Sequence, residues 1–209
     1  ERISELLKVA IQSDGVVEII NTKGEEFSLF DEQFLNDVAN MKEKNLAIEM
    51  LKKLLAQHIK KHQKKNLTQA ELFSEMLDKR LAEYLRGMIS NEEVIKELLE
   101  MAKLMKQHAE EGNALGLSDE EQAFYDALTR PRAVKDFYEN NQLVAMAREI
   151  TDALRKNRTL DWRQKETARA KMRTMIKRLL KKYHYPPEEA QNAIEVVMRQ
   201  CELWADNEE

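Results

Sequence analysis

Apolar residues recur at helical spacing along most of this chain, with one exception near its start. Between residues 3 and 11 the apolar positions fall three or four apart, which predicts one face of an amphipathic helix. After Gly15 the spacing changes: residues 16–20 are mostly β-branched, 21–24 have the composition of a turn, and 26–30 alternate polar and apolar. We therefore expect one short extended or hairpin element near residues 16–30.

From Asp31 onward the pattern is helical, and the predicted helix starts carry capping residues. Asp31 and Asn45 each precede an apolar-periodic run as candidate N-caps. Gly87 is placed to end a helix that opens near residue 68. The capping-box spacing Ser/Thr-x-x-Glu occurs before three apolar-periodic runs, at Thr68 with Glu71, Ser90 with Glu93, and Ser118 with Glu121.

The last third of the chain predicts four more helices. We expect a short one at 133–139, another at 142–156, a basic one at about 161–183, and a final one opened by Pro186 and Pro187, because proline is tolerated in a first turn. The apolar positions of the basic helix form one contiguous face: Ala168, Met172, Met175, Ile176, Leu179, Leu180 and Tyr183.

These elements predict an all-α, multi-helix bundle-like fold with a single short extended element near residues 16–30. The loop from Gly112 to Gly116 holds two of the five glycines and is the best candidate boundary. We expect a helical subdomain at 1–112, which includes the extended element, and a second at 117–209, which carries the basic helix. The two could also form one continuous domain.

Charge is strongly segregated along the sequence. The stretch from Arg155 to Lys182 holds twelve Lys/Arg against two acids, a local net charge of +10, whereas the whole chain carries −4. The remainder therefore carries −14. One surface of the protein is suited to a polyanion.

Two interpretations of the basic stretch are open. Its cations can be paired with acidic neighbours of the same domain, or they can meet the phosphates of a nucleic acid. Aromatic residues are sparse here, which disfavours stacking on single-stranded bases. The candidate nucleic-acid-binding residues are Arg163, Lys165, Arg169, Lys171, Arg173, Lys177, Arg178, Lys181 and Lys182.

Other chemistry has little support in the sequence. There is no phosphate loop, and the acidic pairs sit at predicted helix starts, where negative charge is stabilising. His58 and His62 share a helix face, but neighbouring lysines would repel a metal ion, so a second polyanion contact is the functional alternative to a solvated helix end. We predict no catalytic, cofactor or metal site. The single Cys201 is expected to be a buried apolar group, as in a cytoplasmic protein, and no apolar run is long enough to span a membrane.

Several segments, in order, resemble one known family. They are 159–162 (TLDW), 169–173 (RAKMR), and 176–183 (IKRLLKKY) followed by 185–187 (YPP). Upstream segments agree in the same order: 34–35, 45–47, 66–67, 73–77 and 115–128 (LGLSDEEQAFYDAL). Together they are similar to the C-terminal region of the restriction (R) subunit of type I restriction–modification enzymes. The likeness runs from about Gly15 onward, and the absence of an initial methionine fits a piece of a longer polypeptide.

That resemblance implies a non-catalytic helical module of an ATP-dependent, DNA-translocating endonuclease. The expected partners are the methyltransferase and specificity subunits of the same system and double-stranded DNA. No membrane contact is expected. ATP and Mg are implied only for the full-length subunit, whose hydrolase motifs are not present here. The module would dock the R subunit on the methyltransferase core, contact duplex DNA, or do both. The alternative is a free-standing helical module that binds nucleic acid or protein and has no restriction role.

Overall fold

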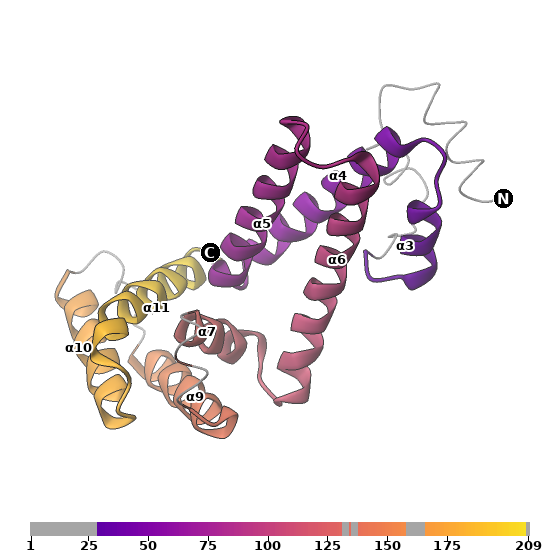
Figure 1. Ribbon diagram of the computed structural model, residues 1–209. Helices are drawn as coiled ribbons and strands as arrows, with labels where there is room; N and C mark the ends of the chain where they lie inside the picture. The colour runs from indigo at the N-terminus through magenta and orange to yellow at the C-terminus, as the bar shows by residue number, and fades with distance from the viewer. Residues whose placement is uncertain (1–28, 131–133, 135–137, 158–165, 208–209) are drawn as a thin grey trace. The chain divides into compact units, whose positions relative to one another are not determined.

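The computed structural model describes residues 29–130, 134, 138–157 and 166–207, and in these residues every regular element is a helix (Figure 1). The helices are α3 (Glu32–Ala39), α4 (Lys44–Gln63), α5 (Leu67–Leu85), α6 (Asn91–Ala114), α7 (Asp119–Thr129), α9 (Asn140–Asn157), α10 (Glu166–Lys182) and α11 (Pro187–Asn207). The all-α prediction is confirmed at this level. The predicted extended element lies almost wholly outside the described residues, and its two described residues, Leu29 and Phe30, lie in a turn.

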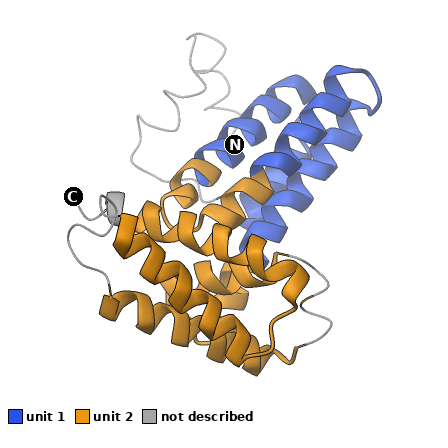
Figure 2. Cartoon of the chain, turned by 90° about the vertical axis from the view of Figure 1, so that its left-hand side faces the viewer, with its two compact units in different colours: residues 1–58, 74–107 blue, residues 59–73, 108–209 orange. Residues whose placement is uncertain are grey.

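Chain contacts divide the protein into two compact units (Figure 2). Unit 1 comprises residues 1–58 and 74–107, and unit 2 comprises residues 59–73 and 108–209. Helices α4, α5 and α6 each contribute to both units. The sequence-based division at Gly112 to Gly116 stays a prediction.

In unit 1, local sequence features determine where helices begin and end. The Asp31 carboxylate accepts hydrogen bonds from the backbone N–H groups of Gln33 and Phe34, as expected of an N-cap. Apolar positions of α3 and α6 such as Val38, Val94 and Leu98 are fully buried. Helix α5 ends before Gly87, whose φ of 70° lies in the left-handed region that favours glycine.

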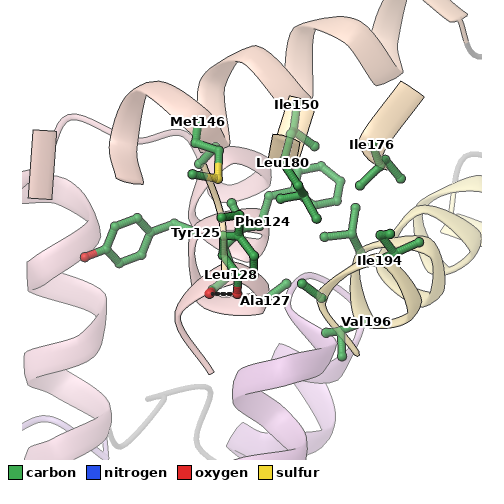
Figure 3. Close-up of a cluster of buried hydrophobic side chains, with 14 of the residues drawn as sticks. Phe124, Tyr125, Ala127, Leu128, Met146, Ile150, Ile176, Leu180, Ile194 and Val196 are labelled. Carbon is green, nitrogen blue, oxygen red and sulfur yellow. Dashed lines mark hydrogen bonds between the residues drawn. The ribbon is translucent and has the colours of Figure 1, made fainter. Parts of the chain in front are cut away.

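Unit 2 holds a large hydrophobic core to which α7, α9, α10 and α11 all contribute. Figure 3 shows side chains from these four helices converging, among them Phe124, Met146, Ile150, Ile176 and Ile194. The apolar stripe predicted for the basic helix is part of this core, which fixes the orientation of α10 within the unit. Cys201 is buried in the same core, as predicted.

Two of the three predicted capping boxes form. Ser118 Oγ accepts from the N–H of Glu121 while the Glu121 carboxylate accepts from the N–H of Ser118, and Ser90 and Glu93 make the same reciprocal pair. These hydrogen bonds lower the pKa of the Glu93 carboxyl, because the Ser90 backbone N–H, and after it the Ser90 hydroxyl, stabilise the charged form.

The third box, at Thr68 with Glu71, was a wrong prediction. Helix α5 begins one residue earlier, at Leu67, and Asn66 Oδ1 accepts from the N–H of Gln69 at 3.1 Å, so the cap position is already taken. Thr68 is buried inside the first turn, and its hydroxyl has no hydrogen-bond partner in the part of the chain that the structure describes. Asn45 was also misplaced as a cap, because α4 begins at Lys44.

Candidate nucleic-acid interface

Helix α10 is held in unit 2 by apolar residues at a spacing of four. Met172, Ile176 and Leu180 are buried, and the helix packs against α9 on one side and α11 on the other. Residues on the opposite side of the helix therefore face solvent. The predicted start of this helix, at 161–165, lies outside the described residues.

The C-terminal end of α10 is fixed without a glycine. His184 adopts a φ of 56°, and the N–H of Tyr185 bonds the carbonyl of Leu180 at 2.9 Å, which closes the last turn. Tyr185 is buried, and its hydroxyl donates to the carbonyl of Leu128 at 2.6 Å. Burial, and after it the negative charge of Glu189, raises the pKa of the Tyr185 phenol.

Two of the candidate cations are engaged by acidic neighbours. Arg169 pairs with Glu202 of α11. Lys182 Nζ lies 2.7 Å from Glu149 Oε1 of α9, and the Tyr183 hydroxyl donates to the same carboxylate at 2.6 Å. The hydrogen bonds from Lys182 and Tyr183 lower the pKa of the Glu149 carboxyl, and the bond to Glu149 raises the pKa of Tyr183 to about 12.

Five other candidates face solvent and form no ion pair among the described residues. All five lie within an 11-residue span of α10: Lys171, Arg173, Lys177, Arg178 and Lys181. Arg163 and Lys165 lie outside the described residues. Internal pairing thus accounts for Arg169 and Lys182. The nucleic-acid interpretation stays a prediction for the five cations that have no ion pair in the described residues.

An open concavity of about 660 Å³ lies against the exposed side of α10. Its described lining comes from this helix: Thr167, Ala170 and Thr174, the apolar Met175 and Leu179, and the charged Lys171 and Arg178.

The histidine pair on α4 does not form a joint site in the described residues. The His58 ring packs against Phe30, and the His62 ring lies edge-on to His108, with ring centres 6.3 Å apart. Lys60 and Lys61 between them are exposed. Within the described ranges, no group of three or more His, Cys, Asp or Glu side chains is placed to hold a metal ion.

A buried polar cluster in unit 2 was missed by sequence reasoning. Asp126 accepts from Asn66 Nδ2 at 2.6 Å and lies 2.8 Å from His108 Nε2, while Gln122 donates to the carbonyl of His108 at 2.9 Å. Gln200, fully buried, accepts from the N–H of Leu67 at 2.8 Å. These partners lie up to 133 residues apart, so no local spacing could have revealed them. They fix the turn between α4 and α5 rather than form a site open to a ligand.

Comparison with known proteins gives a consistent result. Residues 1–207 match a family described as "Type I restriction enzyme HindI endonuclease subunit-like, C-terminal". The chain is 34% identical over 208 residues to the type I restriction enzyme HindI endonuclease subunit of Haemophilus influenzae, covering 98% of this chain and 20% of that protein. It is 30% identical over 184 residues to the protein of Methanocaldococcus jannaschii named "Putative type I restriction enzyme MjaIXP endonuclease subunit", covering 86% of this chain and 18% of that protein.

The chain thus spans about a fifth of the length of these curated relatives. No solved structure matches it. Across the described residues, no helix combines the length and apolar character needed to cross a membrane.

Proposed function

This chain belongs to the family of C-terminal domains of HindI-like type I restriction endonuclease subunits, and on that premise we propose that it binds duplex DNA through the outer face of α10. The contact is to phosphates and does not depend on sequence. It keeps the duplex close to the rest of a restriction complex, while other parts of the longer polypeptide carry the nuclease and motor steps.

The observation that supports this proposal is a set of five exposed cations on α10 that form no ion pair within the described ranges. Arg173, Lys177 and Lys181 follow one another at a spacing of four, where like charges repel and cost an isolated helix roughly 0.2–0.5 kcal/mol per pair. Acidic residues of α9 and α11 relieve only Lys182 and Arg169. An external polyanion would relieve the others, because each phosphate contact releases condensed counterions.

A salt titration of duplex DNA binding tests this proposal. If all five cations meet phosphates, log affinity falls against log salt with a slope of about −4.5. The triple variant Arg173→Glu, Lys177→Glu, Lys181→Glu should weaken binding and lower the slope by about 3 units.

A matched control comes from unit 1. The triple Lys42→Glu, Lys79→Glu, Lys96→Glu changes exposed lysines with no ion pair in the described residues and alters net charge by the same amount. It should leave the slope nearly unchanged. Equal losses in the two triples would mean that overall charge, not α10, governs binding, and no binding at low salt would refute the proposal.

A second candidate function, docking on the methyltransferase core, has its own supporting observation. Leu85 and Met88, at the turn between α5 and α6, are 81% and 67% exposed. Exposed large apolar side chains at a helix–helix turn suit insertion into a protein partner. Leu85→Ser with Met88→Ser should weaken assembly with the methyltransferase and specificity subunits in a pull-down, and should leave the DNA salt slope intact.

ATP and magnesium belong to the full-length subunit in this proposal. The described residues offer no cluster of metal-ligating side chains, and the chain has no phosphate loop. No step of the function proposed for this chain passes through either group.

A further inference from the structure

We propose that α10 enters the major groove of B-form DNA, with cations on its two flanks meeting the phosphates of opposite strands. This inference rests on the proposed function, because it requires that the outer face of α10 bind a duplex. It goes further in naming the groove and the helical form of the duplex.

The exposed cations of α10 form two rows rather than one patch. Each residue advances the helix by about 100°, so Arg173 and Lys177 lie about 100–160° around the axis from Lys171 and Arg178. All four side chains are exposed. Lys181 lies nearer the middle, one turn further along. We call Arg173 and Lys177 row A, and Lys171 and Arg178 row B.

A neutral strip of short side chains separates the rows. Thr167, Ala170 and Thr174 are exposed and fall between row A and row B on the helix surface. The Thr174 hydroxyl donates to the Ala170 carbonyl at 2.9 Å, so its proton is used within the helix. These three side chains therefore present methyl groups outward, and none of them is long enough to read the edge of a base. Lys181 closes the strip at its C-terminal end.

The dimensions of this face suit the major groove. A helix with its side chains is about 10–12 Å across, and the major groove of B-form DNA is about 12 Å wide, whereas the minor groove is about 6 Å wide. With the neutral strip toward the groove floor, rows A and B point at the two walls, where the phosphates of the two strands lie. A flat contact on one backbone would use only one row.

The apolar concavity is lined by row B and by the neutral strip, and neither residue of row A borders it in the described lining. Met175 and Leu179 line that hollow next to Lys171 and Arg178. The aliphatic stems of row B can therefore rest on apolar surface while their charged ends reach outward.

The first test compares duplexes of equal length and charge but different form. The major groove of A-form RNA is deep and narrow and does not admit a helix. We expect the full chain to bind duplex DNA at least tenfold more tightly than the matched duplex RNA at the same salt. Equal binding would overturn the groove assignment and leave the proposed phosphate contact standing, and no binding to either would refute the proposed function itself.

The second test blocks one groove at a time. A bulky neutral group on C5 of the pyrimidines projects into the major groove, where the thymine methyl normally lies, and should weaken binding tenfold or more. A small ligand that fills the minor groove should leave affinity within about twofold. The reverse pattern would overturn the inference.

The third test separates the rows. Arg173→Glu with Lys177→Glu removes row A, and Lys171→Glu with Arg178→Glu removes row B. Each pair should lower the salt slope by about 2 units if both rows meet phosphates, with helical content checked by circular dichroism. A full effect from one pair and none from the other would show a one-sided contact and reject the two-walled geometry.

Discussion

Replacing Gln200 with methionine tests whether one buried amide holds the turn between α4 and α5. Gln200 is fully buried, and its amide group bridges two backbone groups: Nε2 donates to the carbonyl of Lys65 at 2.9 Å, and Oε1 accepts from the N–H of Leu67 at 2.8 Å. Methionine keeps the length of the side chain and removes both bonds. Each backbone group left without a partner costs about 1–3 kcal/mol when buried.

Both backbone groups are only partly buried, so the lower half of that range applies. We expect Gln200→Met to lower the free energy of unfolding by about 2–4 kcal/mol, which corresponds to a fall in Tm of roughly 5–15 °C for a chain of this size. Chemical denaturation monitored by circular dichroism measures the first quantity. Hydrogen exchange at the Leu67 amide should accelerate as well, because that N–H loses its acceptor.

A matched control lies on the same helix. Gln191 is exposed and donates to Glu195 one turn away, so Gln191→Met should change stability by no more than about 0.5 kcal/mol. A cost below about 1 kcal/mol for Gln200→Met, or equal costs for the two variants, would refute the idea that this amide clamps the turn.

Two further predictions concern unit 2. A Cβ added at Gly112 would overlap the Gln122 amide, which donates to the His108 carbonyl. Gly112→Ala should therefore lower the free energy of unfolding by about 1 kcal/mol, despite the better helix propensity of alanine. In a Gln122→Ala background the same change should stabilise the protein, and a double-mutant cycle in urea checks this reversal of sign. The hydrogen bond to Glu149 raises the pKa of Tyr183 to about 12, so the stability that this phenol supplies is complete below about pH 10 and is lost as pH rises from 10 to 12. Tyr183→Phe should remove this pH dependence of the free energy of unfolding. The same pH profile in the variant and the parent protein would contradict the assignment.

Helix positions were predictable wherever their signals were local. The capping boxes at Ser90 and Ser118 need only residues three apart, and both form. The same rule failed at Thr68 because Asn66, two residues earlier, is an equally good acceptor and is held in place by Asp126 from α7. The hydrogen bond between Asn66 and Asp126 joins residues 60 positions apart, so a rule based on local spacing could not predict that Asn66, and not Thr68, caps the helix.

The end of α10 shows a similar limit. A left-handed residue at a helix end is usually glycine, because other residues pay a steric cost of roughly 1–2 kcal/mol there. Here the position is occupied by His184, and burial of Tyr185 against the carbonyl of Leu128 holds the turn closed. The sequence signal for this stop was only the prolines that follow.

For the candidate interface, the sequence predicts where Lys and Arg residues are concentrated, but not which of them form ion pairs with acidic neighbours. Arg169 and Arg173 are one helical turn apart and look equivalent in the sequence. Their environments differ because Arg169 lies on the side of α10 that faces α11, where Glu202 pairs with it, whereas Arg173 lies further round and meets no acid in the described residues. Only the packing of Met172, Ile176 and Leu180 into the core determines that rotation.

This division between paired and free cations separates stability from binding within one helix. Loss of a surface pair such as Arg169 with Glu202 costs at most about 1 kcal/mol of folding free energy, and it leaves the five outward cations in place. Loss of an outward cation removes no bond within the described fold and relieves repulsion along the helix. Arg173→Ala should therefore leave stability equal or higher while DNA affinity falls, and Arg169→Ala should do the opposite. A helix that served only to complete the core would have no reason to keep repelling charges on its outer face, so these opposite responses would identify that face as the part of α10 that serves binding.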